Sequence, residues 1–157
     1  MPHIDLNSDQ PGIRGLLQYR PETGRPISEL AEVLLRGRSS LTRGERELIG
    51  AYVSALNDCR YCSASHSATA AAQLPGGMDL VDQVRADPAA APISAKVQAL
   101  LAIAAAVQRS GHDVTEASVA AAREAGATDL IGQFEVGGLP HERTVAAMHS
   151  FARDVAG

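Results

Sequence analysis

Two cysteines and one histidine lie close together in the chain, with a spacing that suits thiol redox chemistry. Cys59 and Cys62 are the only cysteines among 157 residues, and His66 follows the second by four positions. In a helix, residues at i, i+3 and i+7 share one face, because each turn takes 3.6 residues. We therefore expect two thiols and an imidazole in one row along a helix.

Glu47 is the fourth residue that this arrangement includes. It belongs to the preceding apolar segment, and Asn57-Asp58, which separates that segment from the cysteines, favours a turn or a helix start. Glu47 lies ten residues before position 57 and His66 lies nine after it. Each helical residue advances the chain by about 1.5 Å. An antiparallel helical hairpin would therefore place the Glu47 carboxylate level with the His66 ring.

The composition predicts an all-α fold. The chain is rich in alanine and contains no Trp, three Tyr and two Phe. Alanine is the best helix former, whereas the aromatic residues that favour strands are scarce. A length of 157 residues suits one domain with a core of its own. We expect a single helical bundle built around the hairpin.

Charge and hydropathy exclude several functions. A net charge of −4 provides no basic patch for nucleic acid. No apolar run approaches the roughly 20 residues that span a membrane, and the first residues do not resemble a signal peptide. We expect a soluble cytoplasmic protein. In that compartment a close cysteine pair is more often catalytic or metal-binding than a structural staple.

The pattern of prolines and caps divides the chain. Residues 1–26 hold four of the eight prolines and predict an extended N-terminal arm with one helical turn near 13–19. Such an arm often packs on a neighbouring subunit. The rest, 27–157, reads as one helical domain, with Thr42 and Glu45 as a capping box and Asp58 as an N-cap. Helices are predicted over 27–36, 42–56, 59–74, 79–85, 94–109, 115–125 and 141–155, with a helical turn within 128–136.

A Glu, eleven residues and then Cys-x-x-Cys-x-x-x-His resembles the signature of the alkylhydroperoxidase D-like group in the carboxymuconolactone decarboxylase superfamily. The resemblance covers roughly residues 11 to 130. It implies an all-helical fold on a helical hairpin, a trimer or hexamer, and no cofactor or metal ion. The implied activity is thiol-dependent reduction of hydrogen peroxide or organic hydroperoxides. The implied partner is a dithiol reductant protein or a small thiol.

The same resemblance assigns a role to each motif residue. Cys62 resembles the peroxidatic cysteine, Cys59 the partner thiol that closes the disulfide, and Glu47 and His66 the proton relay. The sequence departs from the family pattern at Ser65, where many relatives carry the first of two adjacent histidines. The tail after residue 127 also lacks the usual apolar final helix.

Other interpretations of these residues stay open at this point. The cysteines can be inert buried residues, or the four motif residues can bind zinc. Glu47 can be a solvated residue at a helix start and His66 a core histidine. At the level of function, the alternatives are a redox sensor without turnover and a decarboxylase acting on a cyclic lactone acid. One solvated face is expected to carry Arg43, Arg46 and Arg60.

Overall fold

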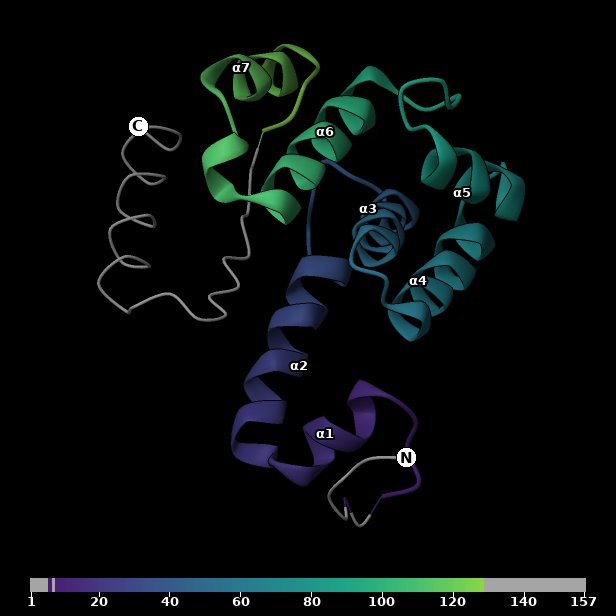
Figure 1. Ribbon diagram of the computed structural model, residues 1–157, viewed down its shortest axis with the longest axis vertical. Helices are drawn as coiled ribbons and strands as arrows, with labels where there is room; N and C mark the ends of the chain where they lie inside the picture. The colour runs from purple at the N-terminus through teal and green to yellow at the C-terminus, as the bar shows by residue number, and fades with distance from the viewer. Residues whose placement is uncertain (1–5, 7, 129–157) are drawn as a thin grey trace.

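The computed structural model describes residue 6 and residues 8–128, and this part of the chain is helical without any strand (Figure 1). The predicted all-α fold is therefore confirmed. Its elements are α1 (Ile13–Tyr19), α2 (Pro21–Arg36), α3 (Arg43–Leu56), α4 (Arg60–Gln73), α5 (Gly77–Ala86), α6 (Ala95–Arg109), the 3-10 turn η1 (Gly111–Asp113) and α7 (Glu116–Glu124). None of the helices described is long and apolar enough to cross a membrane.

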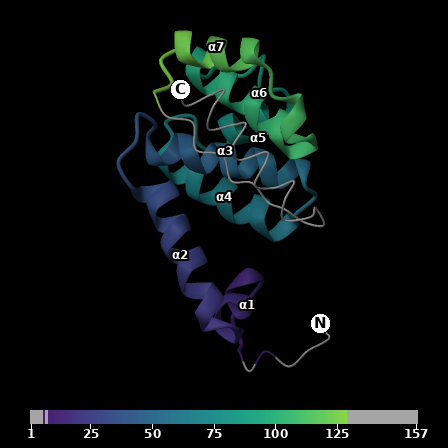
Figure 2. The ribbon, with the colours of Figure 1, turned by 90° about the vertical axis from the view of Figure 1, so that its left-hand side faces the viewer.

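The N-terminal region is helical over more of its length than the sequence predicts. The prediction of extended chain up to residue 26 is wrong in its last part. The helix predicted from residue 27, α2, begins six residues earlier, at Pro21. Proline suits the first helical position, where its missing N–H has no helical partner to lose. Pro26 lies farther inside and α2 continues through it. Both views show α1 and α2 extending away from the bundle formed by the other helices (Figures 1 and 2).

The helical hairpin is formed by α3 and α4, which pack side by side and carry the motif residues (Figure 1). The predicted capping box starts α3: Thr42 Oγ1 accepts the Glu45 N–H at 3.2 Å, and Glu45 Oε2 accepts the Thr42 N–H at 2.7 Å. The predicted N-cap of α4 is wrong by one residue. Asp58 has a φ of 52° and belongs to the turn, and Cys59 is the N-cap.

The core lies between the hairpin and the two helices that cover it, α5 and α6. Its fully buried side chains are small or branched, which lets the helices approach closely. They are Leu48, Ala51, Ala70, Val81, Val84, Val97 and Leu101. The predicted bounds of the helices after the hairpin agree with α5, α6 and α7 to within two residues. The predicted helix over 141–155, and the predicted turn beyond residue 128, lie outside the described residues.

Arg46 fixes the end of α2 to the start of α3, so its predicted place on a solvated face is wrong. Its Nη1 donates to the backbone oxygens of Leu34 at 3.0 Å and Gly37 at 2.9 Å. These carbonyls lie at the end of α2, where no helical N–H remains to bond them. A guanidinium provides several donors in a fixed plane and also complements the negative end of the helix dipole. Arg46 therefore sets how the N-terminal helices join the hairpin.

Candidate active site

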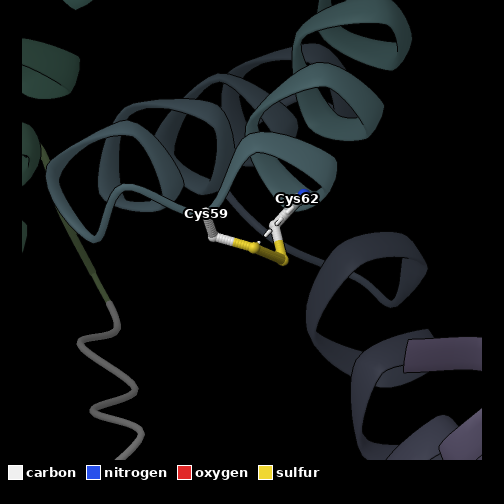
Figure 3. The surroundings of a disulfide bond; sticks show 2 residues. All are labelled: Cys59 and Cys62. Atoms are coloured by element: carbon white, nitrogen blue, oxygen red, sulfur yellow. Dashed lines mark hydrogen bonds between the residues drawn. A yellow bond between two sulfur atoms is a disulfide. The ribbon is translucent and has the colours of Figure 1, made fainter. Parts of the chain in front are cut away.

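A disulfide between Cys59 and Cys62 lies at the start of α4 (Figure 3). The two Cα atoms are 5.4 Å apart, and both residues are partly exposed. Cys59 Sγ also accepts the backbone N–H of Cys62 at 3.4 Å. The interpretation as inert buried cysteines is therefore wrong, because the sulfurs are bonded to each other and their residues reach the surface.

Glu47 and His66 meet across the seam between α3 and α4. Glu47 Oε2 lies 2.6 Å from His66 Nδ1. The Glu47 side chain is 7% exposed and that of His66 is 30% exposed. The alignment predicted from their distances to the turn is confirmed, and the interpretation of Glu47 as a solvated residue is wrong. A buried carboxylate needs a partner, and the imidazole supplies it.

This contact orients the imidazole. An ionised carboxylate only accepts hydrogen bonds, so a ring nitrogen 2.6 Å from Glu47 Oε2 carries the hydrogen. With Nδ1–H donating to Glu47, Nε2 of the neutral ring is the nitrogen able to accept a proton. A carboxylate behind an imidazole also fixes the tautomer and the orientation of the ring, as it does in metal sites and catalytic triads.

The disulfide and the oriented ring share one face of α4. His66 follows Cys62 by four residues, and residues at that spacing lie one above the other on a helix, about 5–6 Å apart at Cβ. The sulfurs also lie at the N-terminal end of α4, where the helix dipole favours negative charge. The hairpin therefore brings all four predicted motif residues together, in the order carboxylate, imidazole and sulfur pair.

Tyr61, between the two cysteines, links this site to the N-terminal helices. Its side chain is 40% exposed. A Cβ added at Gly12, the N-cap of α1, would lie only 2.8 Å from the Tyr61 ring. The backbone at Gly12 therefore rests on the residue inside the Cys-x-x-Cys turn. This contact gives Tyr61 a packing role between the site and α1.

One neighbour of the imidazole was missed in the sequence. A Cβ added at Gly50 would lie 3.0 Å from His66 Nδ1 and 3.1 Å from Cγ, so the ring lies directly against the backbone of α3. The signal was a glycine inside an otherwise apolar helix, three residues after Glu47. Glycine is unfavourable in a helix interior, and it often marks a close approach.

The four motif residues include the ligand types that a zinc ion takes. In residue 6 and residues 8–128, no group of three or more His, Cys, Asp or Glu side chains is arranged to hold a metal ion. Two of the four ligands that a zinc site would need, Cys59 and Cys62, are joined in the disulfide.

Comparison with known proteins finds a similar family and a similar fold. Residues 21–74, which include the whole motif, match the model of the Carboxymuconolactone decarboxylase family. A solved structure from Ralstonia eutropha JMP134, an uncharacterized peroxidase-related protein with an alkylhydroperoxidase AhpD core, is 29% identical. The alignment covers 90% of this chain and 72% of that one, with a TM-score of 0.64. Residues 21–74 are thus similar to this family, and most of the chain is similar to a peroxidase-related protein.

A second solved structure has the same fold. It is an uncharacterized peroxidase-related protein from Silicibacter sp. TM1040, 24% identical, with a TM-score of 0.68. The alignment covers 93% of this chain and 74% of that one. No curated protein matches the sequence significantly. An all-helical fold like that of the alkylhydroperoxidase AhpD core is thus shown.

Proposed function

We propose that this protein is a thiol-dependent peroxidase that reduces hydrogen peroxide or organic hydroperoxides. The observation that carries the proposal is the partly exposed Cys59–Cys62 disulfide on the helix face that also bears His66, whose ring is held by Glu47. A structural neighbour at 29% identity is described as peroxidase-related, which supports the same reaction class.

The first step creates the nucleophile. A free thiol has a pKa of about 8.5 and is mostly protonated at neutral pH, whereas the thiolate is the reactive form. In the reduced protein, His66 accepts the Cys62 proton, directly or through a water, and Glu47 stabilises the imidazolium that results. The buried position of Glu47 strengthens this stabilisation, because screening by water is weak there.

The second step reduces the peroxide. The Cys62 thiolate attacks one peroxide oxygen, the O–O bond breaks, and an S–O bond forms. The leaving alkoxide or hydroxide takes the proton from His66 and departs as alcohol or water. Cys62 is then a sulfenic acid, two electrons more oxidised than the thiol.

The third step closes the disulfide described by the structure. The Cys59 sulfur attacks the sulfenic sulfur of Cys62, an S–S bond forms, and water leaves with the Cys59 proton. A dithiol protein or small thiol then returns two electrons and two protons by thiol–disulfide exchange. The partial exposure of both cysteines gives such a reductant access to the bond.

The test combines thiol titration with a turnover assay. The reduced protein is mixed with one equivalent of hydroperoxide, and thiols are counted before and after. Loss of two thiols together with catalytic peroxide consumption, in the presence of a dithiol, supports the enzyme. Loss of two thiols without turnover supports a redox sensor. Retention of both thiols contradicts both and favours the decarboxylase alternative, which does not depend on the dithiol.

We further propose that a second copy of the chain covers the N-terminal helices, in line with the expected trimer or hexamer. Six apolar side chains of α1 and α2 are exposed, at intervals of three residues along each helix, and the described residues leave them uncovered. They are Ile13, Leu16, Tyr19, Ile27, Leu30 and Val33. A group of exposed apolar side chains on neighbouring helices is a candidate interaction site.

A further inference from the structure

The His66 ring, which contacts Glu47, also lies directly against the α3 backbone at Gly50. An alanine Cβ at this position would lie 3.0 Å from Nδ1, 3.1 Å from Cγ and 3.3 Å from Cε1 of the ring. Three contacts of that length along one edge of the ring exceed what packing tolerates without movement. Any side chain at residue 50 would therefore push the imidazole away from the helix.

The displacement would act on the bond that orients the ring. Gly50 lies one helical turn after Glu47, so both residues present the same face of α3 to His66. The atom that the added Cβ would approach most closely, Nδ1, is the atom bonded to Glu47 Oε2 at 2.6 Å. A movement of the ring would therefore act directly on the atom that makes this hydrogen bond.

We infer that Gly50 is a positioning residue for the Glu47–His66 pair: the missing side chain is what allows the imidazole to dock on α3 with Nδ1 toward the carboxylate. The expected loss of turnover rests on the proposed peroxidase function. The expected displacement of the His66 ring does not. Helix propensity alone would favour alanine at this position, so the glycine is explained by the ring that it accommodates.

Gly44 provides a matched control on the same helix. A Cβ added there would lie 2.8 Å from Leu74 Cδ2, a contact between α3 and the end of α4. Gly44→Ala therefore strains the same helix–helix seam about 9 Å away, six residues along α3. It disturbs packing without approaching His66.

The test compares the full-length reduced protein with three variants, Gly50→Ala, Gly50→Val and Gly44→Ala. The first readout is nuclear magnetic resonance of ¹⁵N-labelled histidine. The wild type and Gly44→Ala are expected to show a His66 ring protonated at Nδ1, with its proton far downfield. In Gly50→Val this downfield proton is expected to disappear, and in Gly50→Ala to move upfield, while circular dichroism shows that the helices persist.

The second readout is peroxide turnover. Misplacing a catalytic group by about 1 Å can cost on the order of 100-fold in rate. We expect roughly a 100-fold loss for Gly50→Val, about 3- to 10-fold for Gly50→Ala, and a rate close to wild type for Gly44→Ala. The loss should appear in kcat, since the substrate does not need residue 50 for binding.

Two results would overturn the inference. One is an unchanged Nδ1 proton signal in both Gly50 variants. The other is an equal loss of that signal in Gly44→Ala, because the effect would then be one of general packing. If the wild type shows the Nδ1 signal but no turnover, the proposed function fails while the positioning role of Gly50 stands.

Discussion

Cys59 Sγ accepts the backbone N–H of Cys62, so the first cysteine of the pair is also the N-cap of α4. A helix start needs an acceptor at this position, and Ser, Thr, Asp and Asn usually supply it. Here a sulfur supplies it and bonds the next turn covalently as well. Serine at position 59 can keep the cap, whereas it cannot form the disulfide.

This geometry makes the two single cysteine variants distinguishable. Cys59→Ser keeps an N-cap acceptor, so we expect a folded protein that reacts once with hydroperoxide and accumulates a sulfenic acid on Cys62. Cys62→Ser should form no sulfenic acid and show no turnover. Dimedone labelling followed by mass spectrometry of the intact protein measures both outcomes.

A label on Cys59 in the Cys62→Ser protein would reverse the assignment of the two sulfurs. Cys59→Ala is a useful companion, because it also removes the cap. Its free energy of unfolding should be about 1 kcal/mol lower than that of Cys59→Ser, so it should unfold at a lower temperature.

The hairpin and its four motif residues could be predicted because each depends on local patterns in the sequence. The capping box at Thr42 sets the start of α3, and the residues around Asp58 set the turn. Once both are placed, helical rise fixes Glu47 opposite His66.

The features that were missed depend on contacts between elements. Nothing local to Arg46 indicates that its guanidinium binds carbonyls at the end of α2. Gly50 is informative only once His66 is known to lie against it. The extended chain predicted before residue 27 is wrong because proline also suits the first position of a helix, and Pro21 starts α2.

Glu47→Gln tests the charge behind the imidazole. The amide keeps an oxygen that accepts from Nδ1–H, so the protein should fold with a loss of about 1 kcal/mol in stability. Without the negative charge, the imidazolium that forms during proton transfer is no longer stabilised by residue 47, and kcat should fall about 100-fold. The control is Glu45→Gln, two residues earlier, because glutamine also serves in a capping box. Wild-type kcat in Glu47→Gln would remove the proton relay from the mechanism.

Val33→Glu tests association through the N-terminal helices. Val33 is the most exposed large apolar side chain of α2, at 64%. A buried charge there would oppose the contact with a second copy, so the variant should shift to a smaller species in size-exclusion chromatography with light scattering. Met78→Glu, the same kind of change at an exposed residue of α5, should keep the wild-type mass. A monomeric wild type at micromolar concentration would contradict the proposal.

Arg46→Ala should loosen α2 while leaving the hairpin intact. The change removes both hydrogen bonds from the guanidinium to the carbonyls of Leu34 and Gly37. A charge-assisted bond of this kind contributes about 1.5–3 kcal/mol where it is well formed. Because Arg46 is only partly buried, we expect a local effect near the lower limit. This corresponds to roughly tenfold faster amide exchange in the last turns of α2.

Two variants serve as controls. Arg46→Lys, with one point charge, should show an intermediate exchange rate in α2, and Arg43→Ala on the exposed start of α3 should show the wild-type rate. Hydrogen exchange read by mass spectrometry resolves the two regions, and equal acceleration in α4 would mean that Arg46 stabilises the bundle as a whole.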